Sequence, residues 1–186
     1  MSLEIEAKFI NIDPEVIRDR LWELGFELVY AEFDVFRATF ILHDPNVTLR
    51  VRKEYGKTTM TYKYTDITQW ALWTEEIEVE VSDFDLTVDI FRKTTQHIRV
   101  LYQESKRELW RKWDTEVSID EWPGTWKYVE IEDPSEELLK DISRRLGVDY
   151  SEAIFGRTWM VYRKLWFDES IVSTQEYLTF ENPPSK

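Results

Sequence analysis

Alternating apolar and ionic residues recur along this sequence and constrain its fold more than any other feature. The alternating runs are residues 3–9, 49–52, 76–81, 116–120 and 129–132. Successive side chains of a β-strand point to opposite faces, so each run predicts a strand with one apolar and one charged face. The charges are also grouped by sign. The first and last runs are acidic apart from Lys8, whereas the hairpin that carries Arg50 and Arg52 is basic.

Helix start and stop signals separate these strands. Asp13 and Asp133 each precede a proline, and a glycine ends each helix that they begin. An N-cap residue followed by proline is typical of a helix start, and glycine of a helix end. Helices are therefore expected at about 14–24, 83–96, 134–146 and within 151–167. This order predicts an α+β fold in which about eight mostly antiparallel strands close into a β-barrel flanked by helices.

One domain accounts for all of these elements. It is expected to span residues 1–167, and residues 168–186 are expected to form a polar C-terminal tail, loose or peripherally docked. The sequence does not decide between a monomer and a homodimer.

The charged strand faces have two readings. For a single strand, a polar face that meets water is the simpler one. If many such strands form a closed sheet whose apolar face lies under the helices, acidic and basic side chains both point into one lumen. Isolated buried charges cost several kcal/mol each, so such a lumen has to hold water or a ligand. A polyanion would satisfy the bases, and a divalent cation would satisfy the acids.

Several charged stretches also occur in a characteristic order. They are Glu4-Ile5-Glu6-Ala7-Lys8, Leu49-Arg50-Val51-Arg52, Lys63, Glu76-Ile77-Glu78, Lys106-Arg107, Asp120, Gly124 and Val129-Glu130-Ile131-Glu132. In this order they resemble the motifs of the CYTH superfamily, the triphosphate tunnel enzymes. The resemblance covers residues 3–165, and residues 119–132 are similar to the branch that contains the class IV adenylyl cyclases. It implies an eight-stranded antiparallel β tunnel over residues 1–167 that takes an organic triphosphate together with Mg²⁺ or Mn²⁺.

The resemblance also implies roles for individual residues. The substrate-binding set is Lys8, Arg50, Arg52, Lys63, Arg107 and, beside it, Lys106. The metal-binding set is Glu4, Glu6, Glu130 and Glu132, with Asp120 close by. Lys8, Arg52, Lys63 and Glu78 are expected to support catalysis, and Glu76 and Glu78 to hold the basic residues or share in metal binding. Arginine forks and a lysine point charge suit a triphosphate.

Two positions depart from the family pattern. Ser105 stands where many members have lysine, so that clamp is missing or is supplied by Arg99, and Lys106 faces the other way unless a bulge turns it inward. Phe36 stands in the second strand where family hydrolases often have tyrosine, and it is expected to face the lumen. By the same parity, Arg37 is expected to lie outside.

The implied activity is metal-dependent chemistry on a nucleoside or other organic triphosphate. Hydrolysis is placed ahead of cyclisation, because attack by water demands less substrate positioning. The first alternative is an adenylyl cyclase that makes cyclic AMP and pyrophosphate from ATP. The second is a non-catalytic nucleotide- or polyphosphate-binding module, which Ser105 and Phe36 favour.

The tryptophans near the expected tunnel allow two interpretations. They are Trp70, Trp73, Trp110, Trp113, Trp122 and Trp126. An aromatic ring can stack on a base at the tunnel mouth, but packing between the barrel and its helices is the simpler explanation.

Composition excludes other classes of function. With 24 basic and 37 acidic residues the net charge is −13, which argues against a protein that coats duplex nucleic acid. The absence of cysteine removes disulfides and thiolate metal sites. Neither a signal peptide nor an apolar run long enough for a membrane span is present, so no membrane partner is expected and cytoplasmic residence is the expectation.

Overall fold

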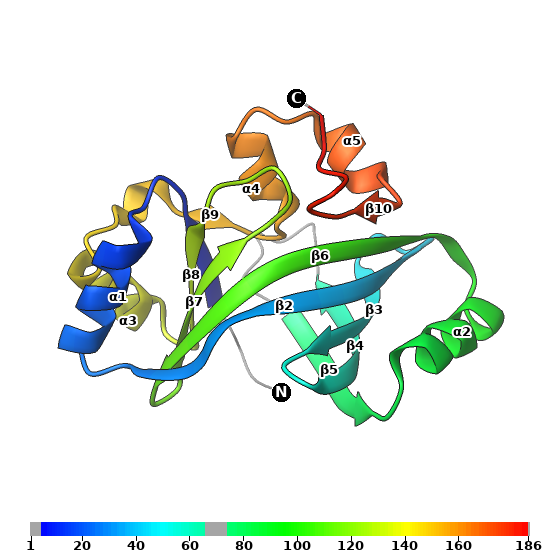
Figure 1. The fold of residues 1–186 in the computed structure, drawn as a ribbon, viewed down its shortest axis with the longest axis horizontal. Helices are drawn as coiled ribbons and strands as arrows, with labels where there is room; N and C mark the ends of the chain where they lie inside the picture. The colour runs from blue at the N-terminus through cyan, green and yellow to red at the C-terminus, as the bar shows by residue number, and fades with distance from the viewer. Residues whose placement is uncertain (1–4, 66–73, 186) are drawn as a thin grey trace.

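The computed structural model describes residues 5–65 and 74–185, and the fold is built around a long, curved sheet (Figure 1). Its strands are β1 (Ile5–Phe9), β2 (Glu27–Leu42), β3 (Val47–Glu54), β4 (Lys57–Thr65), β5 (Thr74–Val81), β6 (His97–Lys112), β7 (Thr115–Glu121), β8 (Tyr128–Asp133), β9 (Ile154–Phe155) and β10 (Tyr177–Leu178). The helices are α1 (Pro14–Glu23), α2 (Phe84–Thr94), α3 (Glu136–Arg145), α4 (Trp159–Lys164) and α5 (Glu169–Thr174), with a 3₁₀ turn at Tyr150–Glu152. Glu4, Trp70 and Trp73 lie outside the described residues.

The sheet corrects the expectation of a closed eight-stranded barrel. Nine strands follow the order β5-β4-β3-β2-β6-β7-β8-β1-β9, all neighbours being antiparallel, and β10 adds to β6 in parallel. The sheet curls strongly into a half-barrel, but its end strands β5 and β9 do not pair with each other within the described part of the chain. The short strand β9 pairs with Ala7 and Lys8 of β1. It thereby occupies the edge of β1 with which another strand would have to pair to close the barrel.

Helices cover the outer, apolar face of the sheet. Ile17 and Leu21 of α1 and Leu139 of α3 pack with Trp110 and Val117 in one core cluster. A second cluster joins α2 to β2, β3 and β6 at the other end of the sheet (Figure 1). The apolar sides of most of the alternating strands are thus buried under helices, as the sequence predicts, and the charged sides face the other way. The exception is β5, where Ile77 and Val79 are exposed.

Local signals set the helix ends. Asp13 caps α1 by accepting a hydrogen bond from the backbone N–H of Glu15 at 3.0 Å, and Pro14 occupies the first turn as expected. Gly25, with φ +75°, ends this helix in a conformation that glycine adopts without strain. The third helix begins two residues later than the Asp-Pro signal indicates, with Ser135 as its N-cap.

The C-terminal segment packs against β6 and against a cluster that contains Trp122 and Tyr128. Residues expected to be a loose or peripheral tail form α5 and β10, and Leu178 of β10 is fully buried. Leu178 joins Trp122, Tyr128 and Tyr162 in a third cluster, in which the Tyr162 hydroxyl donates to the carbonyl oxygen of Pro123 at 2.8 Å. In the described residues, no helix has the length and apolar character that a membrane span needs.

Candidate functional site

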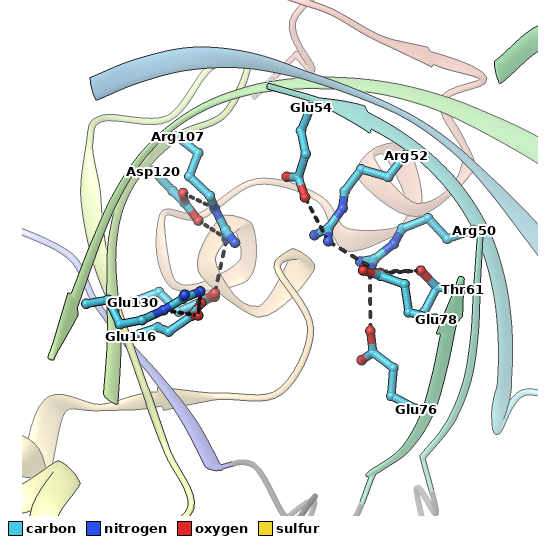
Figure 2. Close-up of polar contacts among 11 residues, drawn as sticks. Arg50, Arg52, Glu54, Thr61, Glu76, Glu78, Arg107, Glu116, Asp120 and Glu130 are labelled. Carbon is cyan, nitrogen blue, oxygen red and sulfur yellow. Dashed lines mark hydrogen bonds and ion pairs between the residues drawn. The ribbon is translucent and has the colours of Figure 1, made fainter. Parts of the chain in front are cut away.

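The charged side chains of the sheet converge on the space that the half-barrel partly encloses. Figure 2 shows Arg50 and Arg52 on one side of this space and Arg107, Asp120 and Glu130 on the other, with their polar ends directed inward. The strand registers explain the convergence, because cross-strand partners share a face of the sheet.

A basic wall forms one side of this space. We use that name for Arg37, Arg50, Arg52 and Lys63 on β2, β3 and β4. Glutamates of β3 and β5 hold its cations: Arg52 lies 2.9 Å from Glu54, and Lys63 lies 3.2 Å from Glu76. Arg50 makes longer contacts, 3.7 Å to Glu76 and 3.8 Å to Glu78. The expected substrate-binding residues Arg50, Arg52 and Lys63 are thereby brought together.

An acidic wall lies opposite. We use that name for Glu6, Asp120, Glu130 and Glu132 on β1, β7 and β8, which surround Lys8 and Arg107. Arg107 donates two hydrogen bonds to Asp120, at 2.7 and 2.6 Å, and one to Glu130 at 3.1 Å. The Lys8 ammonium lies 3.0 Å from Glu130 and 3.4 Å from Glu6, and it donates to the carbonyl oxygen of Gly156 at 2.8 Å.

Three glutamates of the acidic wall are placed to hold a cation. Carboxylate oxygens of Glu6, Glu130 and Glu132 lie within 4.8 Å of one another. Hard oxygen donors of this kind suit Mg²⁺ or Mn²⁺, so the residues present fit the expected metal. Asp120 is engaged by both donors of Arg107 and is not part of this triad.

Electrostatics keep Glu130 of the acidic wall ionised, whereas burial raises the pKa of Asp120. Burial alone would raise the pKa of Glu130, but the charges of Lys8 and Arg107 outweigh it and lower the pKa to about 2. Burial also opposes the charge of Lys8, yet Glu130 and Glu6 raise its pKa above the usual value. A carboxylate and an ammonium are therefore both charged at neutral pH in this part of the site.

The structure reverses the expectation for Phe36 and Arg37. Phe36 is 43% exposed and lies on the outer face, whereas Arg37 is 7% exposed on the inner face, paired across the strands with Arg52. The pairing of β2 with β6 contains register shifts between residues 28 and 33. Beyond these shifts, the alternation of inward- and outward-facing side chains along β2 is displaced. The sequence contains a signal for the inward position of Arg37. When residues are paired symmetrically about a turn centred between Asp44 and Pro45, Arg37 stands opposite Arg52.

Arg37 was therefore the functional candidate that sequence reasoning missed. Its guanidinium carbon lies 4.3 Å from the ring centre of Trp122, and Nη1 is buried without a hydrogen-bond partner among the residues that the structure describes. Burial, together with the nearby charges of Arg50 and Arg52, lowers the pKa of Arg37 to about 9. Arg37 still carries its charge at neutral pH.

Two other expected basic residues are not brought to the site. Lys106 points to the C-terminal segment, where its ammonium lies 5.3 Å from the ring centre of Phe180. Arg99 is exposed and lines a surface pocket with Thr174 and Glu176, so it does not replace the missing lysine. Ser105 is buried.

The described tryptophans divide into two groups. Trp110 and Trp122 are buried in core clusters, as the packing interpretation predicts. Trp113 and Trp126 are more than four-fifths exposed, at 84% and 82%, and neither belongs to a core cluster.

Comparison with known proteins assigns the family. The CYTH domain family matches residues 2–149. A protein of Methanocaldococcus jannaschii named "putative adenylate cyclase" is 30% identical over 151 residues, which is 77% of this chain and 81% of the relative. A Pyrococcus horikoshii structure has a TM-score of 0.67 at 24% identity, and covers 81% of this chain and 94% of its own.

A structure from Vibrio parahaemolyticus, titled as a putative adenylate cyclase, has a TM-score of 0.73 at 9% identity and covers 87% of this chain and 98% of its own. These two structures share the fold of the curled sheet. Because the family match spans most of the sequence, and the inner face carries its charged motifs, this chain belongs to the CYTH family of triphosphate tunnel enzymes.

Proposed function

We propose that this protein binds the triphosphate of a nucleoside or another organic compound between its two charged walls and hydrolyses it with a divalent cation. The observation that carries the proposal is the placement of a cationic wall and a triad of glutamates on the same inner face. Figure 2 shows Arg50 and Arg52 of the first and Glu130 of the second. Each wall suits one part of a metal–triphosphate complex.

The basic wall has hydrogen-bond donors that no residue in the described part of the chain satisfies. Nε of Arg50 and Nε of Arg52 are buried without hydrogen-bond partners. Burial and the charge of Arg52 lower the pKa of Arg50 to about 10, so it stays cationic at neutral pH. A linear triphosphate supplies several negative charges and many acceptor oxygens, and planar guanidinium groups match their geometry.

Individual residues take distinct roles in this proposal. Lys8, Arg50, Arg52, Lys63 and Arg107 contact phosphoryl oxygens, and Lys8, Arg52 and Lys63 stabilise charge as it develops there.

Glu78 acts as a positioning residue. It accepts a hydrogen bond from the Thr61 hydroxyl at 2.8 Å and lies 3.4 Å from Nη2 of Arg52. Glu76 has a similar place beside Lys63. These contacts orient the cations of the basic wall before substrate arrives.

Glu6, Glu130 and Glu132 would hold Mg²⁺ or Mn²⁺, with Asp120 nearby. A divalent cation bound there supplies positive charge to the phosphoryl oxygens. The protein keeps this triad ready because Lys8 and Arg107 hold Glu130 in its ionised form.

Cyclisation of ATP is the second candidate, favoured by the name of the 30% identical relative. Hydrolysis and cyclisation differ in the nucleophile, which is water in one and the ribose 3′-hydroxyl in the other. Incubation of the purified protein with Mg²⁺ or Mn²⁺ and ATP, GTP or tripolyphosphate, followed by separation of products, distinguishes them. We expect inorganic phosphate and the shortened substrate. Cyclic nucleotide with pyrophosphate would overturn the order of the two reactions.

A protein that binds triphosphate without turnover is separated from an enzyme by the double variant Glu130→Gln, Glu132→Gln. An enzyme loses metal-dependent turnover in this variant, because the cation loses two of its three ligands. A simple anion binder holds its ligand as well or better once two acids are neutral. Absence of turnover in the wild-type protein with every triphosphate, despite binding, would overturn the enzymatic proposal.

A further inference from the structure

Arg37 differs from the other cations of the inner face in having no anionic partner. Lys8, Arg50, Arg52, Lys63 and Arg107 each form an ion pair with at least one carboxylate. Among the described residues Arg37 forms none, and its contact is the ring of Trp122. A buried charge without a counter-charge is costly, so Arg37 calls for an anion from outside the protein.

A second buried donor lies in the same region. Among residues 5–65 and 74–185, the hydroxyl of Tyr128 has no hydrogen-bond partner, although the side chain is fully buried. Tyr128 stands opposite Asp120 in the ladder of β7 and β8, and the charge of Arg37 acts on it. A phenol keeps its proton at neutral pH, so the Tyr128 hydroxyl is available as a hydrogen-bond donor.

A purely structural role does not explain Arg37. Stacking on the ring of Trp122 compensates only part of the cost of burying this cation. Desolvation of a guanidinium costs several kcal/mol, and the neighbouring charges of Arg50, Arg52 and Arg107 add repulsion. Arg37 is thus expected to destabilise the ligand-free protein, which is typical of residues retained for binding.

We propose that Arg37 and Tyr128 form an additional phosphoryl-binding subsite, beside Trp122, that takes one phosphoryl group of the bound triphosphate. Trp122 holds the plane of the guanidinium, and the free Nη1 donates to a phosphoryl oxygen. The phenol of Tyr128 donates to the same group. This inference rests on the proposed function and adds to it two residues that the charged motifs of the sequence do not include.

The test measures affinity for inorganic tripolyphosphate by calorimetry, and melting temperature without ligand, in the same variants. Arg37→Gln removes the charge, Arg37→Lys keeps the charge but loses the planar fork, and Tyr128→Phe removes only the hydroxyl. Arg144→Gln is the matched control, because Arg144 is an exposed residue of α3 that pairs with Asp141.

Arg37→Gln and Tyr128→Phe are each expected to weaken tripolyphosphate binding about tenfold or more, because each removes a hydrogen bond to a charged group. The affinity of Arg37→Lys for tripolyphosphate is expected to lie between those of the wild-type protein and Arg37→Gln. Without ligand, Arg37→Gln melts at the same temperature as wild type or higher. Arg144→Gln binds as wild type does.

Unchanged affinity in Arg37→Gln and in Tyr128→Phe, with wild-type binding intact, would overturn the subsite alone. A lower melting temperature of Arg37→Gln with unchanged affinity would assign Arg37 a structural role instead. Should Arg37→Gln fail to fold, Arg37→Lys and Tyr128→Phe decide the question. Wild-type protein that does not bind tripolyphosphate at all would overturn the proposed function and the subsite together.

Discussion

Glu130 connects the cations of the acidic wall. Its carboxylate lies 3.0 Å from Lys8 and 3.1 Å from Arg107, and it also belongs to the carboxylate triad. One residue thereby links two expected phosphate-binding cations to the expected metal site. Its ionisation is the property on which that link depends.

The lowered pKa of Glu130 predicts a defined loss of stability in acid. The folded-state pKa is about 2 against an ordinary value of 4.5, so this group stabilises the protein above pH 4.5 and the contribution disappears as the pH falls toward 2. Denaturant unfolding from pH 7 to pH 2 should show the difference between wild type and Glu130→Gln shrinking across this window. A difference that stays constant would contradict the ion pairs described here.

At the level of elements, the C-terminal segment contributes to the body of the fold. The short strand β10 places Leu178 in a cluster with Trp122, Tyr128 and Tyr162, and Tyr177 stacks on Tyr102 of β6 at 5.2 Å between ring centres. The same cluster supports Trp122, on which Arg37 rests. The segment therefore bears on the site as well as on stability.

Leu178→Ala is expected to destabilise the protein by about 2–5 kcal/mol, because it leaves a cavity in a fully buried cluster. Leu138→Ala is the matched control on α3, where the side chain is 51% exposed, and should change stability by less than about 1 kcal/mol. Urea unfolding of both variants provides the comparison. Equal effects would show that residues 177–178 do not pack as described.

The elements that sequence predicts well are those with a strong local signal. Strands such as β5 and β8 follow from alternation alone, and α1 from Asp13, Pro14 and Gly25. The inward position of Arg37 was not predicted, because the register shifts in β2 depend on its pairing with β6. The sequence does not predict β10, because the segment is mostly polar and few of its residues become buried, of which Leu178 is one.

At the scale of the molecule, the two charged walls are connected by strands β2, β6 and β7 of the open sheet. Within the described residues, no strand closes the sheet on the other side. The number of strands predicts that a sheet is large enough to close into a barrel. It does not determine whether the two edge strands pair with each other. The net charge of −13 likewise averages over walls of opposite sign. A basic site is compatible with an acidic protein because the pairing of strands groups its cations.

A ligand that bridges the two walls should stabilise the whole chain. Tripolyphosphate with Mg²⁺ at one hundred times its dissociation constant adds about 2.7 kcal/mol. For a chain of this size that raises the melting temperature by about 5–10 °C. Scanning calorimetry with tripolyphosphate alone, with Mg²⁺ alone and with both should give the largest shift for the pair. A shift that is the same with and without Mg²⁺ would contradict coupling between the walls.

The central claim is that the basic wall holds a triphosphate for metal-dependent chemistry, and the most direct test is the initial rate of ATP consumption with Mg²⁺ or Mn²⁺. The double variant Arg50→Gln, Arg52→Gln removes two cations of the basic wall. Arg144→Gln, Arg145→Gln makes the same change in charge on the outer helix α3. We predict that the outer variant keeps the wild-type rate and that the inner variant loses at least about a hundredfold, as removal of charge-stabilising groups does in other enzymes. Equal rates in the wild-type protein and the inner variant would contradict the account.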